Sequence, residues 1–196
     1  MNFTAYVKEE KIKARKKNIA EIRKDIDKSW VKEKIKNHMT AFEGLFTYDE
    51  IKQQILSNDL VASKFCKDPG KQNISEILAA QVLGWEKMPS QGSNCVRFND
   101  NGDIVFASSG NTKSADFYEL GYYITQKYTD GEGGAQDNQR NDVIDFLKRG
   151  SIKNKVMAVV DGDYWDLKYR NILIEEFKDN PNVKITSVTE LTTTNT

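Results

Sequence analysis

Apolar residues recur at helical spacing in the first part of the chain, between residues 5 and 38. Most positions between them are charged, so one face of such a helix would be apolar and the other polar. The pattern predicts one long or two shorter amphipathic helices, whose apolar stripe consists of Ile12, Ile19, Ile22, Ile26, Trp30 and Ile35. A further helix is predicted at residues 48–57, with Ile51, Ile55 and Leu56 pointing inward.

A turn and a more apolar helix are predicted next. Asp68-Pro69-Gly70 is a turn signal, and Asn73 or Ser75 can cap a helix that ends at Gly84. Beyond Trp85, clusters of turn-forming residues separate short runs of β-branched and aromatic residues. These runs predict strands at 95–98 and 104–107, and then a hairpin of 115–118 and 122–128 joined through 119–121.

The last third of the chain alternates between helix and strand patterns. A glycine-rich loop at 129–134 is followed by a predicted helix at 136–148, a buried strand at 156–160, a helix at 172–177, a short strand at 183–185 and a frayed tail. This order predicts an α/β (α+β) fold, with a central mixed β-sheet flanked by helices. Residues 1–60 are expected to form an N-terminal helical region, and 61–196 the core.

Composition narrows the chemistry. The chain has one histidine, His38, and two cysteines, Cys66 and Cys95, too few for a structural zinc site. No secretion signal or long apolar run is present, so reduced thiols, a cytoplasmic location and no membrane partner are expected. Any catalysis must then use carboxylates, lysines and amides, and such oxygen ligands favour Mg²⁺, with Mn²⁺ as a possible substitute. The net charge is zero, although residues 8–36 are crowded with Lys and Arg, a pattern typical of a solvated helix face.

The predicted hairpin carries the most informative pair of side chains. Because side chains alternate along a strand, Tyr123, Thr125 and Lys127 share one face. Asp116 on the neighbouring strand can reach this face if the register allows. A carboxylate beside a lysine suits metal-assisted hydrolysis of a phosphodiester, since the carboxylate holds Mg²⁺ and the lysine orients water or stabilises developing charge.

The stretch from Ser114 to Leu147 resembles the core of type II restriction endonucleases of the PD-(D/E)XK superfamily. Ala115-Asp116 resembles the "PD" of that family, and Thr125-Gln126-Lys127 resembles its "(D/E)XK". The resemblance covers roughly residues 68–165, including the strand in VMAVVDGDYW. It implies a restriction-endonuclease-like fold and Mg²⁺-dependent cleavage of specific double-stranded DNA. The helix upstream of the hairpin often carries a glutamate in this family, and Glu76 fits that description as a second metal ligand beside Asp116.

Thr125 departs from the family pattern, because a hydroxyl replaces the second acid. In one interpretation the second acid lies on another element of the fold. Glu76 is then the first candidate for this acid, and Asp142 or Asp137 is the next. Alternatively, Gln126 faces the metal through a β-bulge, or the site is weakened.

Three further features of the sequence have a possible functional explanation and a purely structural one. They are the loop Asp130 to Gly134 as a phosphate contact, the polar helix start with Gln136, Asn138, Gln139 and Arg140 as DNA-binding residues, and Asp161-Gly162-Asp163 as a metal loop or an Asx-capped turn.

The leading hypothesis is a type II site-specific deoxyribonuclease that works as a homodimer or beside a partner recognition subunit. In this hypothesis the helical region at residues 1–60 contacts DNA or mediates dimerisation. The alternatives are a non-catalytic DNA-binding or assembly module that retains the nuclease fold, and a structural helical adaptor.

Overall fold

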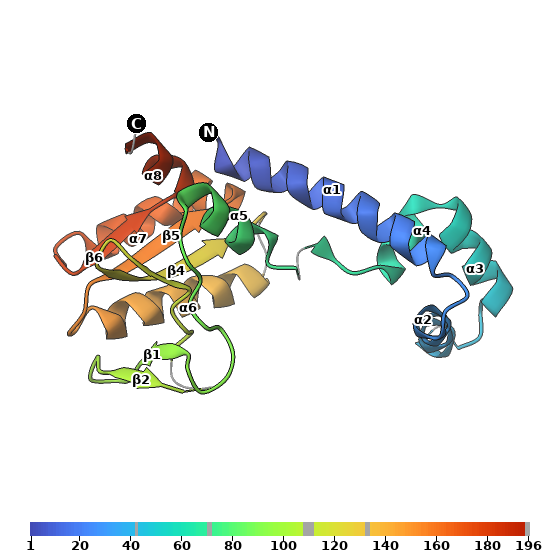
Figure 1. The fold of residues 1–196 in the computed structure, drawn as a ribbon, viewed down its shortest axis with the longest axis horizontal. Helices are drawn as coiled ribbons and strands as arrows, with labels where there is room; N and C mark the ends of the chain where they lie inside the picture. Colours follow the sequence, from blue (N-terminus) through green and yellow to red (C-terminus); the bar gives the residue numbers. More distant parts are fainter. Residues whose placement is uncertain (42, 70–71, 108–111, 132–133, 195–196) are drawn as a thin grey trace. The chain divides into compact units, whose positions relative to one another are not determined.

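The computed structural model describes residues 1–41, 43–69, 72–107, 112–131 and 134–194. By internal contacts the chain divides into two compact units. The helical unit comprises Tyr6–Ile74, and the α/β unit comprises Met1–Ala5 together with Ser75–Thr196 (Figure 1). The predicted boundary after residue 60 therefore differs from the observed division, because residues 61–74 pack with the preceding helices.

The helical unit contains most of α1 (Phe3–Lys24), α2 (Ser29–Ala41), α3 (Tyr48–Ser57) and α4 (Asp59–Phe65). Two shorter helices, rather than one long helix, cover the first amphipathic stretch. Its core confirms most of the predicted stripe and consists of Ile19, Ile22, Ile26, Val31, Ile35, Ile51, Ile55, Ala62 and Phe65. Ile12 and Trp30 are exceptions, since 56% and 36% of their surfaces stay exposed.

Two local signals shape α3 and α4. Thr47 and Glu50 form a capping box at the start of α3, in which each side chain accepts from the other residue's backbone N–H. Asn58 then accepts from Leu60 N and Val61 N, and so caps α4. Because α4 has only seven residues, it shows little periodicity and was not predicted.

The α/β unit is built on a four-stranded mixed sheet, in the order β3-β4-β5-β6. The strands are β3 (Phe117–Glu119), β4 (Tyr122–Tyr128), β5 (Val156–Asp161) and β6 (Val183–Thr186). β3 pairs antiparallel with β4, whereas β4, β5 and β6 are parallel. A separate antiparallel pair consists of β1 (Val96–Phe98) and β2 (Ile104–Phe106). The expected mixed sheet is confirmed.

Helices cover both sheet faces. The helices of this unit are α5 (Ile74–Leu83), α6 (Gly134–Gly150), α7 (Arg170–Phe177), preceded by a π-helical segment at Trp165–Tyr169, and α8 (Val188–Thr194). Val143, Phe146 and Leu147 of α6 and Leu173 and Phe177 of α7 share one core cluster with alternate residues of β5, namely Val156, Ala158 and Val160. The other residues of β5, including Met157 and Val159, are also fully buried, so this central strand is covered on both sides.

The frayed tail predicted at 192–196 is wrong for its first three residues, because α8 extends to Thr194, and 195–196 lie outside the described residues. Ser187 and Glu190 cap its first turn reciprocally, through Glu190 N–H to Ser187 Oγ and Ser187 N–H to Glu190 Oε2. The remaining predicted elements are present with boundaries shifted by a few residues. One of the predicted turn clusters, at residues 108–111, lies outside the described residues, as do part of the glycine-rich loop at 129–134 and the last residue of the turn predicted at 68–70. None of the helices in the described ranges is long and apolar enough to cross a membrane.

Candidate active site

A tight hairpin sets the register of the two strands that carry Asp116 and Lys127. Its two turn residues, Leu120 and Gly121, have φ angles of 56° and 77°, the left-handed conformations that a type I′ turn requires. The ladder pairs Phe117 with Ile124. The backbone N–H of Asp116 also donates to Ile124 O, at 2.8 Å. Two consecutive residues therefore oppose one, which is a β-bulge, and such bulges redirect side chains.

The Asp116 carboxylate turns toward β4 from this bulge. Its Oδ2 accepts from Gln126 N at 2.7 Å and from Thr125 Oγ1 at 3.4 Å. Lys127 Nζ lies 3.7 Å from the same oxygen. The register that the alternation of side chains requires is therefore present, and Asp116 and Lys127 form a partly buried ion pair.

Burial dominates the electrostatics of Asp116, whose surface is only 8% exposed. Desolvation raises the pKa of its carboxyl above the usual range, against the opposing effects of Lys127 and the Gln126 N–H. The negative charge of Glu76 raises the pKa further. The charge of Glu76 therefore acts on Asp116, and the role of Glu76 as a second metal ligand stays a prediction.

Glu76 reaches this region from the first turn of α5. Its Oε1 lies 2.7 Å from Lys87 Nζ, and the side chain is only 15% exposed. The oxygen is buried and its contact with Lys87 lacks the angles of a hydrogen bond. Lys87 is held in place by an antiparallel bridge with Phe117. The site thus contains two acids and two lysines, and Lys87 is the member that the sequence reasoning missed, since nothing in its local sequence marks it.

Two carboxylates suit a hard cation such as Mg²⁺. Within the described residues, no group of three or more His, Cys, Asp or Glu side chains is gathered to hold a metal ion. Mg²⁺ in proteins is usually held by one or two carboxylates, with water and substrate phosphate completing the shell. The contacts of Asp116 given above all involve Oδ2, and Glu76 Oε1 is under-satisfied. Asp116 and Glu76 are therefore the residues of this region that could hold such an ion, and the metal itself stays a prediction.

Thr125, at the position where the family has its second acid, and its neighbour Gln126 both contact Asp116. Thr125 is almost fully buried, and its hydroxyl faces Asp116. Gln126 serves the site through its backbone N–H, while its side chain belongs to the opposite strand face by alternation. The residue as a whole is 5% exposed, and its side-chain Nε2 makes no hydrogen bond within the described part of the chain. The bulge lies on the strand of Asp116, so it does not turn Gln126 toward the site.

The other candidate acids have partners of their own. Asp142 pairs with Lys113 at 3.6 Å. Asp137 accepts from Tyr164 Oη at 3.3 Å and lies 3.8 Å from Arg140. Glu76 is among the largest causes of the pKa shift of Asp116, and neither Asp142 nor Asp137 is. Among the alternatives, Glu76 is therefore the acid that the structure brings into the electrostatic range of Asp116.

The polar start of α6 is largely occupied by contacts within the α/β unit. Gln139 accepts from Thr129 Oγ1 at 2.7 Å. The Arg140 guanidinium lies over the Tyr169 ring, 5.2 Å from its centre. Gln136 has a buried Oε1 that makes no hydrogen bond in the described ranges, and Asn138 is exposed. Asn138 is thus the member of this group that is open to a ligand without rearrangement.

The Asp161-Gly162-Asp163 segment has a structural role at its first residue. Both carboxylate oxygens of Asp161 accept from Val188 N at 3.2 Å, so this buried acid caps α8 instead of a local turn. Gly162 N donates to Thr4 Oγ1 at 3.1 Å, and Thr4 donates to Asp166 at 2.9 Å. These contacts attach the first turn of α1 to the end of β5.

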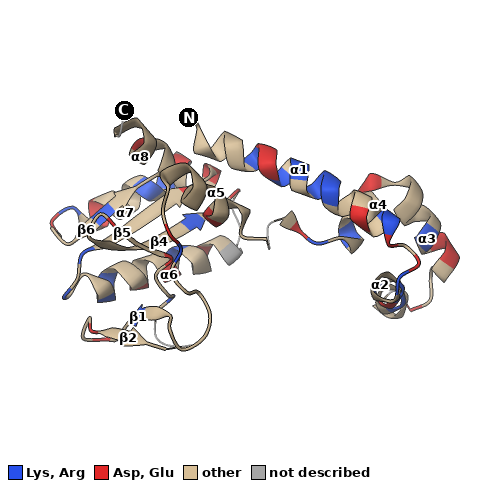
Figure 2. Ribbon diagram, viewed as in Figure 1, with Lys and Arg blue, Asp and Glu red and all other residues tan. Residues whose placement is uncertain are grey.

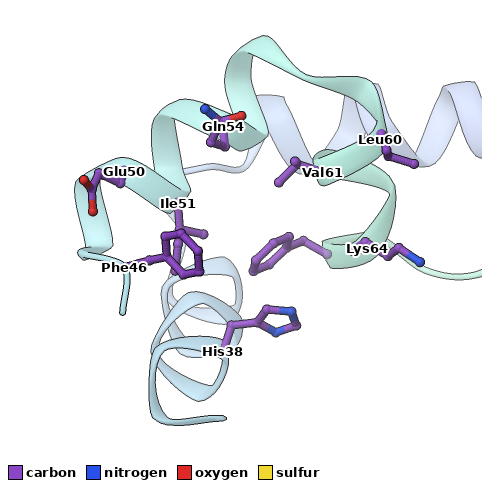
Figure 3. Close-up of a pocket in the computed structure, with 9 residues that line it drawn as sticks. His38, Phe46, Glu50, Ile51, Gln54, Leu60, Val61 and Lys64 are labelled. Atoms are coloured by element: carbon purple, nitrogen blue, oxygen red, sulfur yellow. The ribbon is translucent and has the colours of Figure 1, made fainter. Parts of the chain in front are cut away.

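An apolar pocket of about 430 Å³ lies in the helical unit, lined by residues of α2, α3, α4 and the segment before α3 (Figure 3). The ring of His38 lies in it, with its centre 4.4 Å from that of Phe65. The other lining residues are Phe46, Glu50, Ile51, Gln54, Leu60, Val61 and Lys64. The lone histidine therefore belongs to a different unit from Asp116.

Comparison with known proteins adds no identification, since no protein-family model, curated protein or solved structure matches this chain.

Proposed function

We propose that this protein is a divalent-metal-dependent endonuclease of the PD-(D/E)XK type that hydrolyses phosphodiester bonds in double-stranded DNA. The observation that carries the proposal is the 3.7 Å pair of Asp116 and Lys127, which lies within the electrostatic range of Glu76. A carboxylate that is buried beside a lysine and a second acid is a common arrangement at functional sites.

The order of elements supports the same interpretation. A helix with Glu76 precedes the hairpin with Asp116 and Lys127, and α6 then crosses over to β5, which is parallel to β4. This is the order that the sequence resemblance implies for a restriction-endonuclease-like core. The antiparallel bridge at Lys87 adds a pairing at the outer edge of β3.

Each side chain has a distinct role in the proposed reaction. Asp116 and Glu76 would hold Mg²⁺, which supplies Lewis acidity toward the scissile phosphate and its attacking water. Lys127 would orient that water and stabilise negative charge on the phosphate oxygens as the bond breaks. Thr125 donates a hydrogen bond to Asp116 and so keeps its carboxylate in place.

The first test is cleavage of long duplex DNA in Mg²⁺ and in Mn²⁺. Asp116→Ala and Lys127→Ala should each lower the rate at least about a hundredfold, because one removes a metal ligand and the other the cation at the reacting phosphate. The matched control is Lys113→Ala with Asp142→Asn, which removes an ion pair of similar length, 3.6 Å, and should retain activity. Unchanged cleavage in Asp116→Ala, or none by the wild type in either metal, would contradict the proposal.

A second candidate is a non-catalytic DNA-binding module with the same fold. The specific observation that favours it is Thr125, which occupies the place of an acid and faces Asp116 at 3.4 Å. Binding of duplex DNA without cleavage in either metal would support it. Cleavage of both strands of a duplex needs two sites, so the nuclease proposal includes a homodimer or a partner recognition subunit, which measurement of the mass in solution can distinguish.

A further inference from the structure

The two units carry opposite charge. Residues 6–74 contain 16 Lys and Arg and 11 Asp and Glu, an excess of five positive charges. Residues 75–196 contain 13 Lys and Arg and 18 Asp and Glu, an excess of five negative charges. The neutral total therefore conceals a basic helical unit and an acidic α/β unit, and Figure 2 shows the basic residues along α1. Such asymmetry is typical of chains with a polyanionic partner.

Ion pairs account for part of the basic surface of the helical unit. Lys13, Arg23, Lys28 and Lys52 each lie within 3 Å of an acidic oxygen of the same unit. By contrast, Lys64 and Lys67, at the end of α4 and just beyond it, are exposed and form no ion pair among the described residues. The same holds for other exposed lysines of α1 and α2, namely Lys16, Lys17, Lys24, Lys32 and Lys36. Lys64 and Lys67 differ from these in that they line a cleft.

Lys64 and Lys67 line a polar cleft of about 570 Å³ together with Arg15 of α1. The other lining residues are Ser63, Cys66 and Asp68. We call this surface the basic cleft. Asp68 offsets part of the charge, but it lies at 3.8 Å from Arg15 and both side chains are more than half exposed, so their attraction is weak in water.

The backbone of the basic cleft is fixed. Asn18 Nδ2 donates to Lys67 O at 2.7 Å, and Asn18 is buried. This bond joins α1 to the segment after α4, and it holds the carbonyl of Lys67 while its side chain stays in solvent. A neighbouring hollow of about 540 Å³ shares Cys66 and Lys67, and Lys34 and Trp30 extend the cationic and aromatic lining.

We propose that the basic cleft binds the sugar-phosphate backbone of duplex DNA and supplies the affinity that the acidic α/β unit lacks. The inference rests on the proposed function for its choice of polyanion. Lysines on fixed backbone suit phosphate contacts, which position a protein on DNA without reading its sequence. The cleft is recessed and polar, so it lacks the apolar side chains that add affinity where a protein surface inserts into a membrane.

The test is binding of the full-length protein to a labelled duplex of about 30 base pairs in EDTA, over a series of salt concentrations. Lys64→Gln with Lys67→Gln should weaken binding at least about tenfold at low salt and lower the salt-dependence slope by about two, because two phosphate contacts are lost. Lys155→Gln with Lys184→Gln is the matched control on the α/β unit, where both lysines are exposed, and it should bind as the wild type does.

The outcomes separate the two proposals. If the Lys64→Gln, Lys67→Gln variant keeps the affinity and the salt-dependence slope of the wild type, the proposed role of the basic cleft is wrong, even if the wild type cleaves DNA in Mg²⁺. Binding in EDTA that depends on these lysines would support it, even if no cleavage occurs and the nuclease proposal fails. Binding to vesicles that contain about one third phosphatidylserine, with none to DNA, would overturn it in favour of a lipid surface. Thermal unfolding of each variant checks that these exposed substitutions leave the fold intact.

Discussion

The ion pair between Glu76 and Lys87 places a cation of the chain beside a carboxylate that is proposed to bind metal. At 2.7 Å, with Glu76 mostly buried, this pair is shielded from solvent more than a surface pair is. A divalent ion at Glu76 must therefore compete with Lys87 or share the carboxylate with it. The metal affinity of this site is thus expected to depend on both residues.

Binding of Mn²⁺ in the absence of DNA tests the assignment of Glu76. Glu76→Gln should lower the affinity for Mn²⁺ at least about tenfold, because one of two charged oxygen ligands is replaced by a neutral amide. Asp142→Asn provides the control, since Asp142 pairs with Lys113 instead. Titration followed by electron paramagnetic resonance measures both. If the affinity for Mn²⁺ falls equally in the two variants, Glu76 is not a specific metal ligand.

The sequence predicted this site only in part. Alternation along β4 and the short turn are local properties, so they correctly placed Thr125 and Lys127 on the face of Asp116. The contact of Glu76 with Lys87, in contrast, depends on how α5 packs beside the edge of the sheet. Such long-range packing leaves no periodic signal, and Lys87 was missed for that reason.

The secondary structure elements likewise depend partly on residues nearby in the sequence and partly on residues far away in it. The helix α8 was missed because its TTT run has low helix propensity. Its capping box, Ser187 to Glu190, is nonetheless visible in the sequence as S-x-x-E. The second cap comes from Asp161, 27 residues earlier in the chain. The nearby capping signal could have identified this helix, whereas the contribution of Asp161 could not have been predicted.

The ends of β4 and β5 pack so closely at Gly162 that adding a single methyl group there should strongly lower the stability of the fold. A Cβ there would lie 2.3 Å from Thr129 O, and the φ of +103° is unfavourable for other residues. Gly162→Ala should therefore lower the free energy of unfolding by about 2–4 kcal/mol, through backbone strain and overpacking. Urea denaturation at constant pH measures the change.

Gly121→Ala separates the two causes. Gly121 also has a positive φ, +77°, but a Cβ there would meet nothing within 4 Å. This variant should lose only about 1 kcal/mol, the cost of the backbone conformation alone. Equal losses in the two variants would show that crowding against Thr129 is unimportant.

The stability of the whole α/β unit should depend on the ionisation of Asp161. Desolvation raises the pKa of this carboxyl to about 7, against the lowering by the Val188 N–H and Arg170, and with further increases from Asp166 and Glu190. In the unfolded chain the same carboxyl releases its proton near the ordinary pKa of an aspartate, 3.8. The folded state binds this proton more tightly than the unfolded chain does. The protonated Asp161 therefore makes its full contribution to stability below about pH 4, and that contribution is lost as the pH rises through about 7.

Comparison with Asp161→Asn isolates this effect, because asparagine keeps an acceptor for Val188 N without a charge. The two proteins should have similar stability near pH 4. Near pH 8 the variant should be more stable by about 2–4 kcal/mol, since each pKa unit corresponds to about 1.4 kcal/mol. Chemical unfolding followed by tryptophan fluorescence at each pH provides the measurement. A difference that does not change with pH would refute the shift.

Across the whole molecule, the order of helices and strands was predicted better than the division into units. Apolar periodicity located the mixed sheet and the first helices. The unit boundary depends instead on which surfaces pack together, and residues 61–74 joined the helical unit through α4 and the contact of Asn18 with Lys67.

The attachment of the first residues to the α/β unit has a practical consequence for separating the two units. Phe3 is fully buried, and Thr4 bridges Gly162 and Asp166, whereas residues 6–74 form the helical unit. In topological terms the helical unit is an insertion after the fifth residue. A simple truncation before Ser75 would therefore remove part of the core of the α/β unit. An isolated version is better made by splicing, in which residues 1–5 are retained and joined to residue 75 through a flexible linker.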